Sequence, residues 1–207
     1  MKLADRIRIE KVETLADDWA VLKKTTLAFQ RTDGTWQTLT RETYDRGNGA
    51  TMLLINKEQR TVLLTRQFRY PAFVNGGADL LIEACAGLLD ARDPEAAIKE
   101  EVEEELGVRV STVTRIFESY MSPGSVTEKL HFFVAEYTPN DRISKGGGVA
   151  LEGEDIEVLE VPFAQALAMI DRGEIVDGKT IMLLLYTHWK RLVEPAPPAV
   201  APAGDRQ

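Results

Sequence analysis

Five of the six residues from Glu100 to Glu105 are glutamates, and their spacing suits a metal site. In a helix that turns about 100° per residue, Glu101, Glu104 and Glu105 share one arc, whereas Glu100 and Glu103 face solvent. Pairs of like charge four residues apart cost roughly 0.2–0.5 kcal/mol each, and the negative end of the helix dipole adds to this cost. Because carboxylates are hard oxygen ligands, the arc predicts a site for Mg²⁺ or Mn²⁺ rather than zinc.

The segment around the glutamates carries the start and stop signals of a helix. Asp93 suits the N-cap, Pro94 suits the first helical position, and Gly107 suits the stop. An apolar stripe that recurs every four residues predicts a core-facing side, made of Ile98, Val102 and Leu106. The carboxylate arc flanks this stripe. We therefore expect the metal at the edge of the core, where backbone carbonyls of residues 86–91 could complete its coordination.

Composition limits the class of protein. The 207 residues are 44% hydrophobic, which suits one compact domain with an appendage. The formal net charge of −8 argues against general binding to nucleic acid or to an anionic membrane, although metal ions can bridge acidic residues to phosphate. The start of the chain has no apolar run of signal-peptide length, and no stretch approaches the roughly 20 apolar residues of a membrane helix.

The cysteine and the two histidines are interpreted as structural residues. A single cysteine, Cys85, cannot form an internal disulfide, and together with the missing export signal this predicts a cytoplasmic protein. We expect Cys85 to be a small buried group rather than a reactive thiol. His131 and His188 lack the spacing of zinc ligands.

The rest of the chain alternates strand and helix patterns. Residues 19–31 and 35–46 flank Asp33-Gly34 and predict a β-hairpin, which would be marginal alone and so favours a dimer interface. Further strands are expected over residues 51–56, 61–69, 80–87, 113–121, 129–137 and 156–162, and helices over 162–173 and 178–192. Helices that cover a mixed sheet predict an α/β/α sandwich. We divide the chain into a β unit (1–46), a main domain (47–191) and a disordered tail rich in Pro and Ala (192–207).

Gly87, Asp93 and the run from Glu100 to Val108 resemble the Nudix box, the metal-binding motif of Nudix hydrolases. The chain departs from the family's pattern in three places. Glu100 stands where an arginine is expected, Asp93 stands where a glutamate is expected, and the spacing between them is one residue shorter. The missing arginine leaves open how the acidic cluster is held in orientation. Lys99, one residue earlier, could compensate for it, but its side chain is predicted to lie on the opposite side of the helix.

The similarity extends over residues 17–186 and is closest to the GDP-mannose pyrophosphatase (NudK-type) group of that superfamily. It is carried by residues 44–54, 65–77, 81–90, 120–128, 131–137, the Gly-rich loop with residues 154–160, and residues 173–180. The resemblance implies the Nudix fold and Mg²⁺-dependent hydrolysis of GDP-mannose to GMP and mannose 1-phosphate, with Mn²⁺ as another metal. Pro123, in the loop after the box, is similar to a feature of the neighbouring ADP-ribose pyrophosphatases. Hydrolysis of ADP-ribose to AMP and ribose 5-phosphate is therefore one alternative function. An inactive Nudix-like binding module is another.

The resemblance also assigns roles to residues. The implied metal ligands are the Ala86 carbonyl, Glu101, Glu104, Glu105 and Glu154, of which Glu101, Glu105 and Glu154 are catalytic, while Glu152 competes with Glu154. The implied substrate contacts are Trp19, Thr40, Arg41, Glu42, Arg69, Ala86, Gly87, Leu88, Glu128, Gly153 and Lys179. In that group Trp19 and Arg69 come from the partner subunit of a homodimer.

Several of these residues also have an ordinary structural interpretation. Trp19 could fill a dimer core, and Arg66 and Arg69 could form surface ion pairs. Lys179 could simply precede a helix. Residues 146–148 could be a phosphate loop, but three glycines more often form a flexible hinge.

Overall fold

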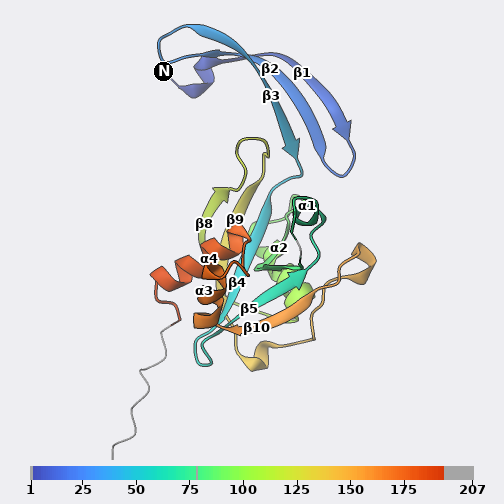
Figure 1. Cartoon of the computed structure of the whole chain (residues 1–207), viewed down its shortest axis with the longest axis vertical. Coiled ribbons are helices and arrows are strands. Elements are labelled where there is room, and N and C mark those ends of the chain that lie inside the picture. Colours follow the sequence, from blue (N-terminus) through green and yellow to red (C-terminus); the bar gives the residue numbers. More distant parts are fainter. Residues whose placement is uncertain (1, 78, 194–207) are drawn as a thin grey trace, which may run out of the picture.

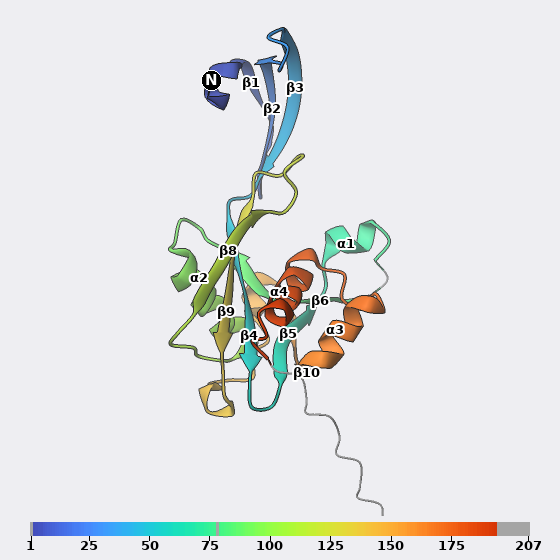
Figure 2. The same cartoon turned by 90° about the vertical axis from the view of Figure 1, so that its left-hand side faces the viewer.

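The computed structural model describes residues 2–77 and 79–193 and forms two sheets (Figures 1 and 2). The predicted disordered tail lies outside these residues from position 194 onward. A three-stranded antiparallel sheet at the N-terminus has the order β1 (Ile7–Asp17), β2 (Val21–Gln30) and β3 (Trp36–Asp45). It projects from an α/β body that contains all the remaining strands.

The predicted hairpin is present as β2 and β3, but it belongs to a three-stranded unit. Its turn is built as expected, because Gly34 has a φ of 87° and the Asp33 carboxylate accepts the backbone N–H of Thr35 at 2.9 Å. Strand β1 was missed by the sequence analysis. Two register shifts in β1 break the alternation of apolar and polar residues that marks a strand.

The body contains a seven-stranded mixed sheet. Its strands are β4 (Gly49–Asn56), β5 (Thr61–Gln67), β6 (Leu81–Glu83), β7 (Cys85–Leu88), β8 (Thr114–Tyr120), β9 (Lys129–Glu136) and β10 (Glu157–Pro162). The order is β10-β5-β4-β9-β8, and only the β4–β9 pair is parallel. The predicted strand 80–87 is divided at Ala84, whose N–H donates to Thr180 Oγ1 at 2.6 Å, so that β6 pairs with β5 and β7 pairs with β4.

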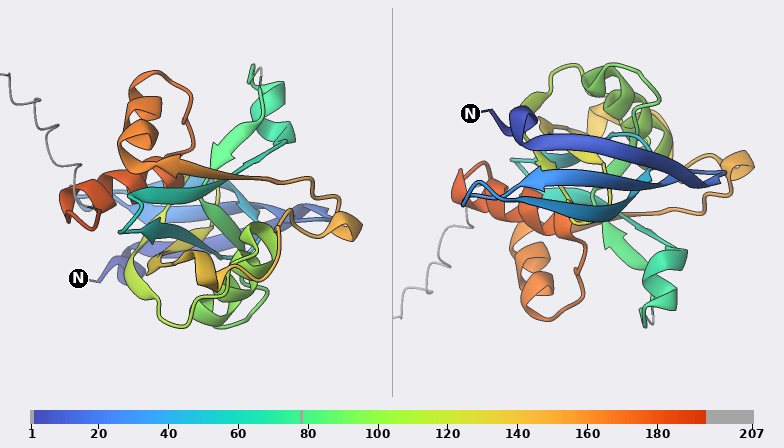
Figure 3. Two further views of the ribbon diagram at one scale, coloured as in Figure 1. Left: turned by 90° about the horizontal axis from the view of Figure 1, so that it is seen from below. Right: turned by 90° about the horizontal axis from the view of Figure 1, so that it is seen from above.

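Helices cover both faces of this sheet, as the prediction of an α/β/α sandwich requires (Figure 3). On one face lies α2 (Pro94–Glu101), which continues into a π-helical turn (Val102–Leu106); on the other lie α3 (Phe163–Asp171) and α4 (Gly178–Trp189). Side chains of β4 alternate between the two cores: Met52 and Leu54 pack toward α2, whereas Leu53 and Ile55 pack toward α3 and α4.

Some short segments lie outside the predicted pattern. A helix of one turn, α1 (Tyr70–Val74), follows Arg69, and 3-10 turns occupy Leu3–Arg6, Pro139–Asp141 and Ala150–Glu152. Val193, which the sequence analysis placed in the tail, is 3% exposed and belongs to the core beneath α3 and α4. In the described part of the chain, none of the helices has the length and apolar character needed to cross a membrane.

The helix that carries the glutamates begins and ends as predicted. The Asp93 side chain accepts the N–H groups of Glu95 and Ala96 at 3.0 and 3.1 Å, and Gly107 ends the helix with a φ of 67°. The apolar stripe is fully buried at Ile98, Val102 and Leu106. Local capping and one apolar face therefore fix this helix against the sheet.

We expect Asp93→Ala to lower the free energy of unfolding by about 1 kcal/mol, because two N–H groups at the start of α2 lose their acceptor. Urea denaturation followed by circular dichroism measures the loss. Asp171→Ala, at the exposed end of α3, is the control and should not destabilise the protein. Equal stability of Asp93→Ala and the parent protein would refute the capping role.

Candidate metal and phosphate site

The π-helical turn separates two glutamates that the sequence analysis placed on one arc. Glu105 is only 2% exposed, whereas Glu104 is exposed to solvent. The prediction assumed a regular α-helix, but the N–H of Gly107 bonds to the carbonyl of Val102, and this wider turn changes the rotation per residue. Glu101, half-buried, and Glu105 are therefore the inner carboxylates, and Glu104 stands at the solvent side.

A glycine in β7 makes room for Glu101. A Cβ atom on Gly87 would lie 2.0 Å from Glu101 Oε1, so any other residue there would displace this carboxylate. Gly49, on the neighbouring strand β4, plays a similar part: a Cβ there would lie 3.1 Å from the Gly87 carbonyl oxygen and 3.3 Å from Glu128 Oε1. Strand ends of β4 and β7 thus gather Glu101 and Glu128 around Gly87, beside Ala86 and Leu88.

Glu105 is held in an unfavourable electrostatic environment. Burial raises the pKa of Glu105 to about 7, the contact with the Cys85 thiol opposes this shift, and the charges of Glu101 and Glu154 add to it. Its Oε2 atom is buried and has no hydrogen-bond partner. Cys85 is itself fully buried, as predicted, and burial followed by the Glu105 charge raises the pKa of the thiol. A buried carboxylate oxygen without a hydrogen-bond partner is suited to bind a cation.

The residue types at this site suit a divalent ion, although their carboxylates are not close enough together to form a complete set of metal ligands. Within residues 2–77 and 79–193, no three Asp, Glu, His or Cys side chains stand at the separations of a metal centre. Glu101 and Glu154 nevertheless lie close enough for both of their charges to raise the pKa of Glu105. These ligands are all oxygen atoms, and one of them, Glu105 Oε2, has no hydrogen-bond partner. Oxygen ligands suit a hard cation such as Mg²⁺ or Mn²⁺ better than zinc.

The three glycines at positions 146–148 serve close packing rather than phosphate binding. The N–H groups of Gly147 and Gly148 donate to the carbonyls of Glu105 and Glu104 at 2.9 and 3.1 Å, so they are already occupied. A Cβ on Gly146 would lie 2.3 Å from the Glu105 carbonyl oxygen. The loop thus satisfies carbonyl groups at the end of the helix, and the phosphate-loop interpretation is wrong.

The same loop carries Glu154 to the acidic helix. Glu154 Oε2 accepts the N–H of Val149 at 2.8 Å, and a Cβ on Gly148 would lie 2.4 Å from the same oxygen. Gly153, one residue earlier, is exposed and has a φ of 79°. The side chain of the competing acid, Glu152, lies outside the described part of the structure.

Two predicted phosphate-binding cations share one buried carboxylate. Arg69 Nε donates to Glu83 Oε2 at 2.7 Å, and Lys179 forms ion pairs with Glu83 and with Asp177. Arg69 thus lies beside the acidic cluster of its own chain, whereas the resemblance implies that it comes from the partner subunit. The sequence analysis missed Glu83, although one acid inside the apolar stretch LIEACAG was a visible signal. Arg66, by contrast, pairs with Glu157 at the surface, in accordance with its structural interpretation.

The remaining predicted contacts lie on the N-terminal sheet. Thr40, Arg41 and Glu42 are exposed on β3, a strand of the sheet that projects from the body (Figures 1 and 2). Trp19, 67% exposed, lies closer, because the Arg46 guanidinium is 6.0 Å from its ring centre and also bonds to Glu128. Arg46 was not predicted, and it links this sheet to the Gly87 region.

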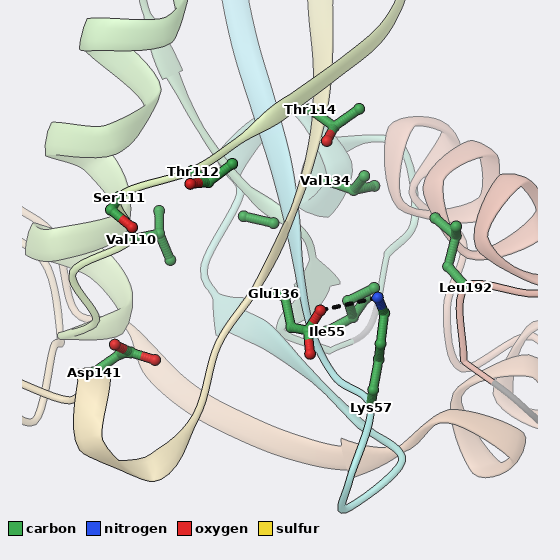
Figure 4. A pocket seen from close by; sticks show the side chains of 11 residues that line it. Ile55, Lys57, Val110, Ser111, Thr112, Thr114, Val134, Glu136, Asp141 and Leu192 are labelled. Atoms are coloured by element: carbon green, nitrogen blue, oxygen red, sulfur yellow. Dashed lines mark ion pairs between the residues drawn. The ribbon is translucent and has the colours of Figure 1, made fainter.

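A separate cavity of about 330 Å³ lies at the other end of β4 (Figure 4). Ile55 and Thr114 are among its lining residues, and Lys57 pairs with Glu136 at 2.9 Å across it. None of the predicted site residues lines this cavity. The chemistry-bearing groups therefore gather at the opposite end of the strand, around Gly49 and Gly87.

Comparison with known protein families agrees with this geometry. Residues 45–184 match the NUDIX domain, and the chain belongs to the Nudix family, whose members are typically dependent on a divalent metal. Residues 6–44 match the family described as the GDP-mannose pyrophosphatase NudK N-terminal domain, which places the chain in that group. The predicted membership is thereby confirmed.

Individual relatives support the same grouping. The GDP-mannose pyrophosphatase of Citrobacter koseri is 52% identical over 192 residues, which are 92% of this chain and 100% of the relative. That of Escherichia coli (strain K12) is 51% identical over 193 residues, which are 93% and 100%. The crystal structure of an ADP compounds hydrolase has a TM-score of 0.67 at 19% identity and covers 90% of this chain and 95% of that one, a likeness of fold alone.

We expect Glu105→Gln to stabilise the metal-free protein near pH 8, on the order of 1–3 kcal/mol, because a buried charge without a partner disappears. The folded carboxyl binds its proton more tightly than the unfolded one, so stability of the parent falls as pH rises from about 4.5 to 7 and stays low above. The advantage of the variant should vanish near pH 4.

Urea unfolding in the presence of a chelator measures this difference. Glu103→Gln is the matched control, since the Arg109 partner lowers the pKa of Glu103 and its removal should not stabilise the protein. A parent protein at least as stable as Glu105→Gln at pH 8 would contradict the account of Glu105.

Proposed function

We propose that the protein hydrolyses the pyrophosphate bond of GDP-mannose in a divalent-metal-dependent reaction that yields GMP and mannose 1-phosphate. The observation that carries this proposal is identity of 51–52% over the full length of relatives named GDP-mannose pyrophosphatase. The likeness to the ADP compounds hydrolase concerns the fold only, so it does not favour ADP-ribose as the substrate. The inner carboxylates of Glu101 and Glu105 support a catalytic rather than a silent module.

The acidic helix would hold the metal. Glu101, Glu105, Glu154 and the carbonyl of Ala86 are the proposed ligands of Mg²⁺, with Mn²⁺ as a substitute, and Glu104 at the solvent side could act through water. When bound, the metal supplies polarisation of the phosphate oxygens and a lower pKa for the attacking water. The glycine loop brings Glu154 to the acidic cluster, and there its carboxylate can accept a proton from the attacking water.

The cations at the site would bind the phosphates. Arg69 and Lys179 both point their charged groups at Glu83 and can donate to phosphate oxygens while that carboxylate fixes their positions. As charge develops on the phosphates during hydrolysis, these donors stabilise it without moving far. The proposed contacts to the remainder of the substrate are Ala86, Gly87 and Leu88 on β7, Glu128 near Gly49, and Gly153 in the late loop.

The N-terminal sheet would complete the site through a homodimer. Paired residues of an antiparallel sheet share a face, so one face of this sheet carries a continuous apolar set, made of Ile7, Ile9, Val12, Leu27, Phe29 and Leu39. Ile9 and Val12 are 59% and 55% exposed, and Ala20 is the only buried residue between positions 7 and 45. A second copy would cover this face, on which Arg41 also lies, whereas Thr40 and Glu42 lie on the opposite face of the sheet. Together with Trp19, these residues are the proposed substrate contacts from the N-terminal sheet.

We expect Glu101→Gln to reduce kcat/KM for GDP-mannose by roughly 100-fold or more, since losses of 10–100-fold are typical even for partners of metal ligands. The change keeps the size of the side chain, so the fold should be retained. Steady-state assays with Mg²⁺ and circular dichroism measure the two effects. Glu103→Gln, on the outer side of the same helix, should retain the activity of the parent protein.

The substrate is tested with a panel of nucleotide sugars. The values of kcat/KM should be highest for GDP-mannose and lower for ADP-ribose, and activity should disappear with a chelator. Preference for ADP-ribose would favour the alternative function. Full activity of Glu101→Gln, or of the chelated enzyme, would refute the proposed reaction.

The dimer is tested by light scattering at micromolar concentration. We expect the parent protein to be dimeric and Ile9→Lys to be monomeric. Dimer formation would bury the charged ammonium group of the lysine in an apolar interface, and the loss of its hydration would oppose association. Thr38→Lys adds the same charge on the other face of the sheet, opposite Ala28, and should remain dimeric. A monomeric parent protein would exclude the shared site.

A further inference from the structure

We propose that Arg92 is a positioning residue, which locks the loop between β7 and α2 onto the acidic helix and so holds Glu101 over Gly87. The inference rests on the proposed metal-dependent function. It answers how the acidic cluster is oriented when Glu100 occupies the box position of an arginine. The polarity is reversed here: the acid is on the helix, and the guanidinium comes from the loop.

One guanidinium contacts five groups of the loop and the helix, two carbonyls and three carboxylates. Arg92 Nη1 donates to Glu100 Oε2 at 2.6 Å, Nε donates to the Leu89 carbonyl at 3.2 Å, and Nη2 donates to the Leu88 carbonyl at 3.1 Å. Nη2 also lies 3.7 Å from Asp90 Oδ2 and 3.8 Å from Glu101 Oε1. The planar fork of an arginine can satisfy several acceptors in fixed directions, which a lysine cannot do.

The loop that Arg92 holds is conformationally strained. Asp90 and Ala91 have φ values of 44° and 67°, in the left-handed region that costs roughly 1–2 kcal/mol for residues with a side chain. Such backbone persists only where the surroundings determine it. The bonds from Arg92 to Leu88 and Leu89 supply that constraint, together with the backbone bond from Arg92 N–H to the Leu89 carbonyl at 2.7 Å.

The position of this loop decides the position of Glu101. Gly87 lies at the end of β7, just before the loop, and a Cβ there would lie 2.0 Å from Glu101 Oε1. Strand β7 and helix α2 are therefore in close contact at Gly87 and Glu101. The Arg92 guanidinium joins the same two elements through its bonds to Leu88 and Glu100. Lys99, the other nearby cation, is directed elsewhere, to Glu95 at 2.7 Å and to the Ser111 carbonyl at 3.0 Å.

The test measures the affinity of the full-length protein for Mn²⁺, with electron paramagnetic resonance used to determine the concentration of the free ion. We expect Arg92→Gln to weaken binding on the order of 10-fold, the lower end of the range for groups that orient metal ligands. The direction of the effect is diagnostic. If Arg92 acted only as a nearby positive charge, its removal would tighten the binding of a cation. Unchanged or tighter binding by Arg92→Gln would overturn the positioning role.

Two further variants separate geometry from charge and from loss of folding. Arg109 forms an exposed ion pair with Glu103, which lies on the helical segment that carries Glu101. Arg109→Gln therefore removes the same charge as Arg92→Gln, but it should change the affinity for Mn²⁺ by less than about 2-fold. Arg92→Lys retains the charge but loses the fork, and it should weaken binding as Arg92→Gln does; parental affinity would contradict the proposal. Urea unfolding without metal should show all three variants folded.

The outcome also separates this inference from the proposed function. Uptake of Mn²⁺ by the parent protein with unaltered affinity in Arg92→Gln overturns the role of Arg92 alone. A parent protein that takes up no Mn²⁺ overturns the metal-dependent function on which the inference rests.

Discussion

Repulsion among the carboxylates at the end of α2, a helix with one buried and one exposed face, governs how this protein is built. Glu105 is almost fully buried, one of its oxygens has no partner, and the charges of Glu101 and Glu154 act on it. The helix dipole is negative at the same end. A fold that retains this arrangement gives up stability in the metal-free state, and a divalent cation is the species whose charge and ligand preference would recover it.

Much of the surrounding architecture can be understood as a means of bringing these groups together. Gly87 removes a side chain where Glu101 must lie, and the glycines at 146–148 let a distant loop reach the helix end and deliver Glu154. The divided strand β6–β7 passes from β5 to β4 and carries Glu83 and Gly87 into the same region. Cations are then fixed nearby through Glu83, whose carboxylate bonds both Arg69 and Lys179.

Sequence reasoning succeeded where the determinants are local. The Asp93 cap, the Gly107 stop and the buried stripe of the acidic helix follow from neighbouring residues, as does the turn at Asp33-Gly34. The layered fold followed from the alternation of strand and helix patterns, and the box resemblance identified the family. Local rules could not reveal β1, because its bulges disrupt the pattern, nor the π-helical turn, because capping residues do not specify the hydrogen-bond step.

Tertiary partners were the other part that the sequence did not disclose. Arg46, Glu83 and Arg92 each act through residues that are distant or on another element, so spacing alone gives no reason to select them. The three glycines at 146–148 show the same limit, since their role depends on the helix against which they pack. The most direct measurement of the central claim is titration calorimetry of Mg²⁺ or Mn²⁺ into the folded, metal-free protein near neutral pH. We expect saturable uptake of the metal and a higher unfolding temperature; folded protein that shows neither uptake nor stabilisation would contradict a metal site at these carboxylates.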